Sequence, residues 1–437
     1  MSSEGAGFFH PSRPGFRFTV LFFVGLLPLG SYFAYDTIGA MAPTLIEAWH
    51  TNRQSIGWLY TVYSLAAIPS LLVGGLLIDR MGTRRSSLLF SALVVIGAAI
   101  VAASDSFGMA ALGRAIFGAG SETLIVVQSA ILARWFRDRE LALSFGITLS
   151  LARLGTLFSF NTVSLIAVRS GWKLAFWIAA GLCVASLLSN VVYFFLDRRG
   201  ERVLRLHDEG GGDKIVVGDI VRFRPAYWYT VVLCVTFYSA IFPFTDLSTD
   251  FFHDKWGLPL AAEETGSFLQ GVFSNFLHMF STAPGTTSII IFASMICAPF
   301  AGGLVDRIGK RTALMILGSL LLVLSYLLLG FTRIPPYGPM MILGAAFVLV
   351  PAALWPAVPL LVEKERTGTA YGTMTMLQNI GLALFPWLNG RLRDTTHTYT
   401  ASMLMFASLG IVGLIFAWLL RRADRSAGSI LDRGKVA

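Results

Sequence analysis

Six ionisable residues lie inside long apolar stretches of this sequence: Asp36, Arg114, Glu122, Arg153, Asp246 and Asp250. Charges in such surroundings are costly to bury and usually serve a function. Glu122 and Arg153 lie equally far along the chain from a polar turn at Arg137–Asp138, so two antiparallel helices would hold both at one depth, roughly 20 Å from the turn. A carboxylate and a guanidinium at one depth either form a structural ion pair or open to bind a ligand that carries an amine and a carboxylate.

Asp36 follows a polar stretch that contains Tyr32 and Tyr35 and is typical of a loosened helix segment rather than a lipid-facing surface. The alternative is a residue at the outer end of its helix, exposed to water. Arg114 precedes Glu122 by about two helical turns and shares its face, where it either complements the acidic groups or anchors the helix. Asp36, Tyr32 and Tyr35 are candidate substrate-binding residues. Asp36 and Glu122 are also candidate proton carriers, and Arg114 is a candidate for the same role or a structural one.

The second half of the chain offers aromatic and amide side chains as binding candidates: Tyr238, Trp355, Gln378 and Asn379. Trp355 lies among three prolines, which predict a broken helix of the kind that membranes tolerate where it lines a cavity or flexes. The paired amides Gln378 and Asn379 either bind ligand or form hydrogen bonds between helices.

The composition decides what positions these residues. Of the 437 residues 55% are hydrophobic and 14% are charged, which excludes a soluble chain and predicts an all-α polytopic membrane protein. Twelve stretches are long enough to cross a bilayer as helices. They cover about residues 17–48, 54–78, 86–104, 107–135, 140–168, 172–196, 226–252, 287–305, 312–332, 338–362, 367–392 and 399–420.

The positive charges alternate along the chain. Most of the 34 Lys and Arg residues fall in the loops on the side of the N-terminus, which predicts that both termini are cytoplasmic. The net charge of +9 is then a topology signal, and no nucleic-acid partner is expected. Three cysteines exclude a disulfide framework. We find no metal-ligand cluster, nucleotide-binding loop or nucleophile triad, so no cofactor and no enzyme activity are expected.

A local repeat divides the chain into residues 1–197, a polar cytoplasmic linker at 198–224, and residues 225–437. Gly75-Leu-Leu-Ile-Asp-Arg-Met-Gly-Thr-Arg-Arg85 recurs as Gly302-Gly-Leu-Val-Asp-Arg-Ile-Gly-Lys-Arg311, each after the second stretch of its half. The repeat predicts two six-helix bundles and a transporter with its site between them. The motif predicts a gate, in which an Asp binds the positive end of a neighbouring helix and a Gly permits a tight turn. The expected gating residues are Asp79, Arg80, Gly82, Arg84, Arg85, Asp306 and Arg307; the alternative is that the arginines only mark topology.

This motif resembles the signature of the major facilitator superfamily, and the twelve stretches and central linker agree with its plan. Further stretches look like the branch of that superfamily that contains dipeptide transporters. They are 30–36, 113–124, 150–155, 353–356 and 368–383. The resemblance implies a dipeptide substrate, with Glu122 facing its amine and Arg153 its carboxylate, and broad side-chain selectivity. It also implies alternating access, by uniport or proton symport, in a single chain.

Other functions and features stay open. Another amphoteric or anionic small molecule, such as an amino acid, a carboxylate or a drug, would use the same halves and gates. A receptor or scaffold that does not transport is the remote alternative. Short loops without glycosylation sequons favour a bacterial inner membrane. An insertion at about 258–286 has the apolar spacing of an amphipathic helix, either on the membrane surface or over the pocket mouth.

Overall fold

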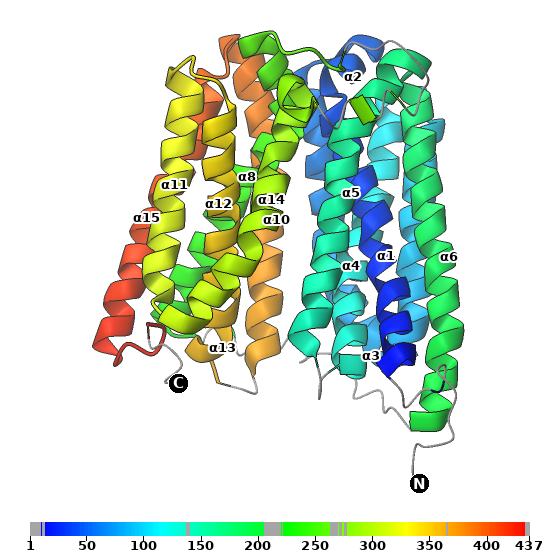
Figure 1. The fold of residues 1–437 in the computed structure, drawn as a ribbon, viewed down its shortest axis with the longest axis vertical. Coiled ribbons are helices and arrows are strands. Elements are labelled where there is room, and N and C mark those ends of the chain that lie inside the picture. Colours follow the sequence, from blue (N-terminus) through cyan, green and yellow to red (C-terminus); the bar gives the residue numbers. More distant parts are fainter. Residues whose placement is uncertain are drawn as a thin grey trace. The chain divides into compact units, whose positions relative to one another are not determined.

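The computed structural model is all-α in the residues that it describes, which are His10, 14–136, 140–204, Ile220, 222–262, Gln270, 273–274, 278–363 and 366–432. Long helices make up both halves of the sequence (Figure 1). The α-helices are α1 (Pro14–Ala40), α2 (Ala42–Ala48), α3 (Arg53–Ala103), α4 (Phe107–Phe136), α5 (Leu141–Ser170), α6 (Trp172–Leu204), α8 (Pro225–Trp256), α10 (Ala283–Ile308), α11 (Arg311–Phe331), α12 (Tyr337–Leu354), α13 (Val358–Leu361), α14 (Thr367–Thr396) and α15 (Thr400–Ser426).

Ten described segments are long and apolar enough to cross a membrane, and each coincides with a predicted stretch. The predicted number of twelve is therefore not confirmed by this criterion. The two remaining stretches do form helices. In the described part of α10 only the segment Ala283–Ala298 is apolar, and it is shorter than the segments counted among the ten. Helix α14 is long enough, but amide, hydroxyl and glycine residues dilute its apolar character, so it is not among the ten.

Three helix breaks have identifiable causes. α3 is two helices joined at Gly82, whose backbone (φ 76°, ψ 164°) is not helical. The predicted stretch 17–48 divides at Met41, because Pro43 has no N–H to bond to the Gly39 carbonyl and continue α1, whereas the first turn of α2 tolerates a proline. α12 ends at Leu354 and gives way to a 3₁₀ turn, Trp355–Ala357, before α13. The helix break predicted around Trp355 is confirmed.

Two predictions about polar segments need comment. Helix α6 runs on to Leu204, so residues 198–204 of the predicted linker are helical. Their Arg and Glu side chains favour a helix, and nothing in the sequence forces it to end earlier. The rest of that linker lies mostly outside the described residues. Most of the amphipathic helix predicted within 258–286 also lies outside them, and α10 already begins at Ala283.

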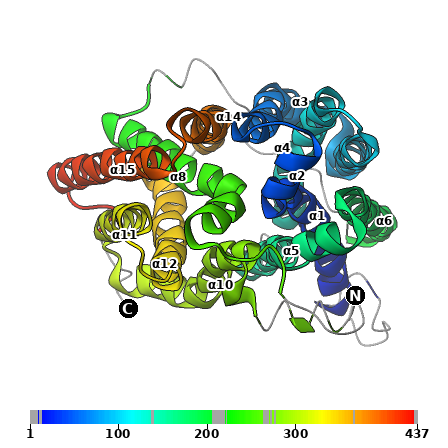
Figure 2. The same cartoon turned by 90° about the horizontal axis from the view of Figure 1, so that it is seen from above.

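The chain forms two compact units, and each is described here by itself. Unit 1 comprises 1–37, 65–159 and 173–212, and unit 2 comprises 38–64, 160–172 and 213–437. The predicted division at 198–224 stays a prediction. In unit 2, α8 packs against α14 and α15, while α12 packs against α10 and α11 (Figure 2). In unit 1, a Cβ at Gly120 of α4 would lie 2.8 Å from the backbone nitrogen of Val94 in α3, so this glycine serves close helix packing.

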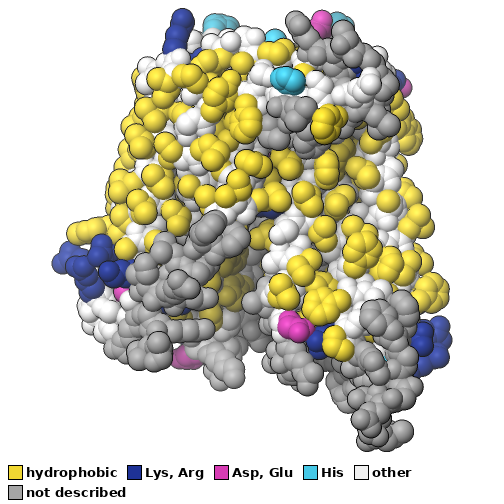
Figure 3. Space-filling view, viewed as in Figure 1, with side chains coloured by type: hydrophobic (Ala, Val, Ile, Leu, Met, Phe, Trp, Pro, Cys, Tyr) yellow, Lys and Arg dark blue, Asp and Glu magenta, His cyan; other side chains and the backbone are white. Residues whose placement is uncertain are grey.

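The visible surface agrees with a membrane setting. Hydrophobic side chains cover the middle of the helices, and charged side chains gather towards the helix ends (Figure 3). Large apolar residues on α6 are well exposed, among them Leu188 at 61% and Phe195 at 62%. Side chains of this kind are stable there only against lipid or another apolar partner.

Candidate functional site

Tyr32 lies close to several charged side chains of unit 1. Its hydroxyl on α1 lies within electrostatic range of Glu122 on α4, Arg153 on α5 and Asp36 on its own helix. Close helix packing makes this possible, since any side chain at Gly155 of α5 would collide with the α1 backbone. The structure therefore brings Glu122 and Arg153, which the sequence analysis selected as a pair, close to Tyr32 and Asp36, which it selected separately.

Asp36 lies in an uninterrupted part of α1 and is only 6% exposed. The Thr156 hydroxyl of α5 donates a hydrogen bond to its carboxylate, and the charges of Arg114 and Arg153 act on it. The expectation of a loosened helix segment is wrong, because the backbone hydrogen bonding of α1 continues through this region. The alternative of a water-exposed outer residue is wrong as well, because the side chain is buried. Thr156 was not among the predicted site residues.

Arg114 is buried among aromatic rings. Its guanidinium lies 5.1 Å from the ring centroid of Tyr35 and 5.4 Å from that of Phe117. Cation–π contacts of this kind stabilise a charge that has been removed from water. Arg114 thus connects α1 and α4 and also acts on the charge of Asp36, so both predicted roles, structural and complementary, find support in its surroundings.

Glu122 and Arg153 differ from the two buried charges. Both side chains are half-buried, on the facing helices α4 and α5. That exposure leaves part of each side chain accessible to a partner of opposite charge. The assignment of Glu122 to an amine and Arg153 to a carboxylate stays a prediction, beside the alternative of a structural ion pair.

A second group of predicted residues lies in unit 2, around the broken helix. The Trp355 indole donates to the Tyr238 hydroxyl at 2.9 Å. Pro359 lacks the N–H that would bond to the Trp355 carbonyl in a continuous α-helix. That carbonyl instead accepts hydrogen bonds from the Val358 N–H and from the Tyr371 hydroxyl, the latter at 3.0 Å. Tyr371 also stacks on Trp355 (centroids 5.9 Å apart) and was missed as a candidate, although it lies in one of the family-like stretches.

The two amides of α14 have different surroundings. The Gln378 carbonyl oxygen accepts from the Cys234 thiol of α8 at 3.7 Å, which supports the helix-joining interpretation for that residue. Asn379 is 1% exposed and donates to the Thr375 carbonyl of its own helix at 3.1 Å. Its side-chain oxygen has no hydrogen-bond partner among the described residues. Neither alternative for Asn379, ligand binding or a hydrogen bond between helices, is decided by these contacts, and both stay predictions.

The first copy of the repeated loop is held by an ionic network in unit 1. Arg84 lies 2.9 Å from Glu201 and 3.7 Å from Asp197, both near the end of α6. Asp197 is fully buried and also accepts from Arg134 at 3.1 Å and from the Trp135 indole at 2.8 Å. Sequence reasoning missed these acidic partners because it placed Glu201 in a solvated linker.

The other gate residues differ in how far the structure describes them. Gly82 has a positive φ of 76°, so the prediction that it permits the turn is confirmed. Arg80 and Arg85 are exposed. The side chains of Asp79, Asp306 and Arg307 lie outside the described part of the structure, and their gating roles stay predictions. In the second copy, Gly309 has a φ of 69° and makes the equivalent turn.

A cluster of charges in unit 2 joins the start of α3 to α8 and to the turn between α14 and α15. We call it the Arg53 cluster, after its central cation; its other members are Asp250, Asp394 and Tyr399. Arg53 donates to both carboxylate oxygens of Asp250, at 2.6 and 3.2 Å. Asp394 accepts from the backbone N–H groups of Arg53 (3.3 Å) and Gln54 (2.8 Å), which caps the first turn of α3.

Tyr399 completes the Arg53 cluster. It lies between α14 and α15, and its hydroxyl donates to Asp250. Burial raises the pKa of Tyr399 well above its usual range, and the Asp250 charge raises it further. The phenol therefore keeps its proton and remains a donor. The sequence drew attention to Asp250 as a membrane-depth acid but gave no sign of its partners.

Comparison with known proteins decides the family. The sequence matches the Major Facilitator Superfamily over residues 24–285 and 279–435, which is nearly the whole chain. The chain belongs to that superfamily. It is an integral, multi-pass membrane protein, and the family points to transport rather than catalysis.

Several transporters are similar in sequence to this major facilitator protein. The chain is 33% identical to the lysosomal dipeptide transporter MFSD1 of Danio rerio, over 86% of this chain and 81% of that protein. It is 30% identical to MFSD1 of Homo sapiens, over 95% of this chain and 88% of that protein. The hexuronate transporter of Escherichia coli K12 is 22% identical over 91% of this chain and 93% of its own length.

A solved structure supports the fold. A mutant form of the nucleoside transporter NupG superposes with a TM-score of 0.70 over 92% of this chain and 99% of its own. The two are 13% identical, so the likeness concerns the fold alone. The predicted major facilitator architecture is thus supported by both sequence and structure, apart from the exact number of crossings.

The turn at Gly82 gives a direct test of the first repeated loop in this transporter. A backbone at φ 76° and ψ 164° is essentially restricted to glycine, so Gly82→Ala should cost about 1–3 kcal/mol. We expect the melting temperature of the purified protein to fall by about 1–3 °C. Gly75→Ala is the matched control, because a Cβ there meets nothing within 4 Å. Equal melting temperatures for the two variants would contradict the prediction.

Proposed function

We propose that this protein transports short peptides, chiefly dipeptides, by alternating access. The Glu122 carboxylate binds the free amine of the peptide, and the Arg153 guanidinium binds its terminal carboxylate through two parallel hydrogen bonds. Such a clamp reads the peptide backbone, so side-chain selectivity is broad. The dipeptide transporters named among the relatives, at 30–33% identity over most of the chain, support this substrate class.

The observation that carries the proposal is the convergence of opposite charges on Tyr32. Glu122 and Arg153 come from different helices, yet both act on one hydroxyl and both remain partly exposed. A zwitterionic ligand presents an amine and a carboxylate a few ångströms apart, which matches such a pair. Asp36 is buried and accepts a hydrogen bond from the Thr156 hydroxyl. It is the carboxylate suited to carry a proton if transport is coupled to one. If transport is not coupled to a proton, the protein is a uniporter and Asp36 has a structural role alone.

The Arg53 cluster supports a gating role at one end of the molecule. It joins α3, from the first half of the sequence, to α8 and α14, from the second half, through a nearly buried ion pair. The distribution of Lys and Arg supports an orientation in which this end faces outward and both chain termini are cytoplasmic. We propose that the cluster closes the outer gate and opens once in each transport cycle, in a monomer of a bacterial inner membrane.

A second candidate is the transport of a small carboxylate. The 22% identity to a hexuronate transporter favours it, because an arginine such as Arg153 serves a sugar acid as well as it serves a peptide. In that case Glu122 would face no amine and would act as a structural partner of Arg153. The two candidates differ in whether the ligand must carry a positive charge.

A melting-temperature screen of the purified protein separates them, since a ligand that binds only the folded state raises its stability with occupancy. The ligands are dipeptides with free termini, the same dipeptides acetylated or amidated, free amino acids and glucuronate. We expect shifts with many free dipeptides and none with peptides blocked at either end. A shift with glucuronate and none with any peptide would overturn the dipeptide proposal in favour of the second candidate.

A further inference from the structure

The segment that follows α15 folds back onto that helix. Helix α15 ends at Ser426, and Gly428 (φ 94°) and Ser429 (φ 56°) reverse the chain. Asp424, which is 4% exposed, fixes the reversal: its backbone carbonyl accepts from Ser429 N–H at 2.7 Å, and its carboxylate accepts from Leu431 N–H at 2.9 Å. Leu431 is fully buried. The turn therefore has a defined conformation that delivers the next residue to a fixed position.

That next residue, Asp432, caps the start of α11. Its carboxylate accepts from the Thr312 N–H at 3.0 Å and from the Thr312 hydroxyl at 2.8 and 2.9 Å. Lys310, the residue at the cap position, makes no side-chain cap of its own. Asp432 thus supplies, across 120 positions of sequence, the acceptor that a helix N-terminus normally takes from its own cap residue.

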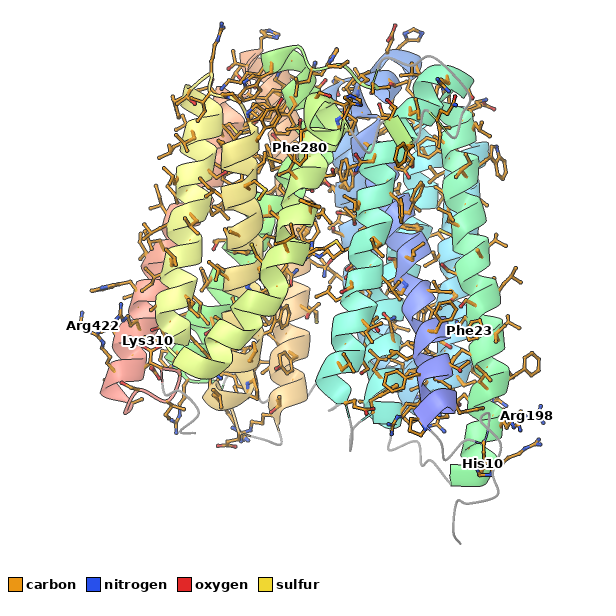
Figure 4. The ribbon with its side chains drawn as sticks, in the orientation of Figure 1. His10, Phe23, Arg198, Phe280, Lys310 and Arg422 are labelled. Atoms are coloured by element: carbon orange, nitrogen blue, oxygen red, sulfur yellow. The ribbon has the colours of Figure 1, made fainter. Side chains whose placement is uncertain are left out.

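Two further contacts bind the same segment to the loop before α11. The Lys310 N–H bonds to the Asp432 backbone carbonyl at 3.3 Å, and Arg311 donates to the Leu431 carbonyl at 3.2 Å. Lys310 has a positive φ of 33°, a conformation that a lysine seldom adopts unless its surroundings hold it. Figure 4 labels Lys310 and Arg422, which lie at the same end of α11 and α15.

The contacted loop is the second copy of the repeated motif, and the comparison with the first copy is informative. In the first copy, Arg84 is held by Asp197 and Glu201 near the end of α6, the last helix before the predicted linker. In the second copy, Arg311 and Thr312 are held by the segment that follows α15. Each loop is therefore held by groups from the last helix of its half or from the residues after it. Asp197 is fully buried, whereas Asp432 keeps partial exposure.

We propose that residues 427–432 form a releasable clasp on the loop between α10 and α11. Closed, the clasp caps α11 and holds the loop in its positive-φ turn. Open, it frees the first turn of α11 and the loop together while the rest of unit 2 stays folded. The clasp is held by the Asp432 carboxylate, by buried Leu431 and by hydrogen bonds to two backbone carbonyls. The Gly428–Ser429 turn is the hinge, so the clasp can open without unpacking the helices. The proposal concerns the conformation of this loop and does not depend on which substrate is transported.

Hydrogen–deuterium exchange of the full-length protein in detergent tests the clasp without a substrate. We expect Asp432→Ala to speed the exchange of residues 311–314 about tenfold, because alanine cannot accept from the Thr312 N–H, while α8 and α12 change by less than about twofold. Ile430→Ala is the matched control: Ile430 lies in the same segment, is 45% exposed, and should leave exchange at the wild-type rate. Thr312→Val, which keeps the N–H but removes the hydroxyl, should give a smaller increase, and combining it with Asp432→Ala should add little.

Two results would overturn the clasp. Unchanged exchange at 311–314 in Asp432→Ala would mean that the carboxylate does not hold the helix start. Faster exchange throughout unit 2 would mean that the segment supports the whole fold and does not open by itself. Ending the chain after Ser426 gives an independent check, because this truncation removes the clasp entirely and must reproduce the local effect of Asp432→Ala.

Discussion

Arg153→Ala should weaken the binding of a free dipeptide roughly a hundredfold, or by about 3 kcal/mol, and leave the binding of its amidated form unchanged. The reason is that the variant removes the guanidinium, whereas amidation removes the carboxylate, so each change destroys the same interaction. Once either the guanidinium or the carboxylate is missing, removing the other causes no further loss of binding free energy. Glu122→Gln should behave in the same way towards peptides whose amine is acetylated. Calorimetric titration of the purified variants with each peptide form gives the affinities.

The control for this experiment is Arg169→Ala, which removes an exposed arginine from the far end of the same helix. It should bind every peptide as the wild type does. If Arg153→Ala and the wild type had equal affinity for the free dipeptide, the clamp would be wrong. Glu122 and Arg153 would then be a structural pair.

Neutralising one member of the Arg53–Asp250 pair should slow transport more than neutralising both. Asp250→Asn leaves Arg53 partly buried without its carboxylate, and Arg53→Gln leaves Asp250, which is only 3% exposed, without its cation. Breaking such a pair costs about 3–5 kcal/mol, whereas replacing both charges is often close to neutral. We expect each single variant to reduce initial uptake into proteoliposomes at least about tenfold. The double variant should recover to within about threefold of the wild type.

The same variants should bind dipeptide with near wild-type affinity, because the Arg53 cluster contains none of the residues assigned to the peptide. Arg391→Gln is a useful comparison. Arg391 lies on the same helix as Asp394 but is exposed and contacts the Trp387 ring (5.1 Å to its centroid), so the loss should be mild. Full uptake by both single variants would exclude the Arg53 cluster as a gate.

The helices of this fold could be predicted from the sequence because apolar stretches of bilayer length leave few alternatives. Two local breaks were predictable for equally direct reasons: Gly82 lies in a turn motif, and Trp355 lies among prolines. The end of α6 was not, since Arg198 and Glu201 suit a helix and a solvated linker equally well. The polar loops and the insertion at about 258–286 contain few residues whose type predicts where a helix begins or ends.

The candidate site was predictable only in part. Depth along two helices placed Glu122 and Arg153 at one level, and the structure brings both within range of Tyr32. The burial of Asp36 could not be foreseen, because it depends on the packing of α5 and on Thr156. The partners of Arg53 and Asp197 lie 197 and 63 positions away along the chain, and a single sequence carries no signal for such pairings.

The polar character of α14 has a consequence for how the protein is made. Helix α14 carries Gln378 and Asn379 and is not among the ten helices apolar enough to cross a membrane. The free energy that it gains by transfer into lipid is therefore too small to keep it in a bilayer by itself. Its neighbours in unit 2 are α8, which is synthesised before it, and α15, which is synthesised after it. Stable insertion of α14 should therefore wait until α8 is available to cover it. A ribosome paused just after α14 would hold a chain whose membrane integration depends on a helix made more than a hundred residues earlier.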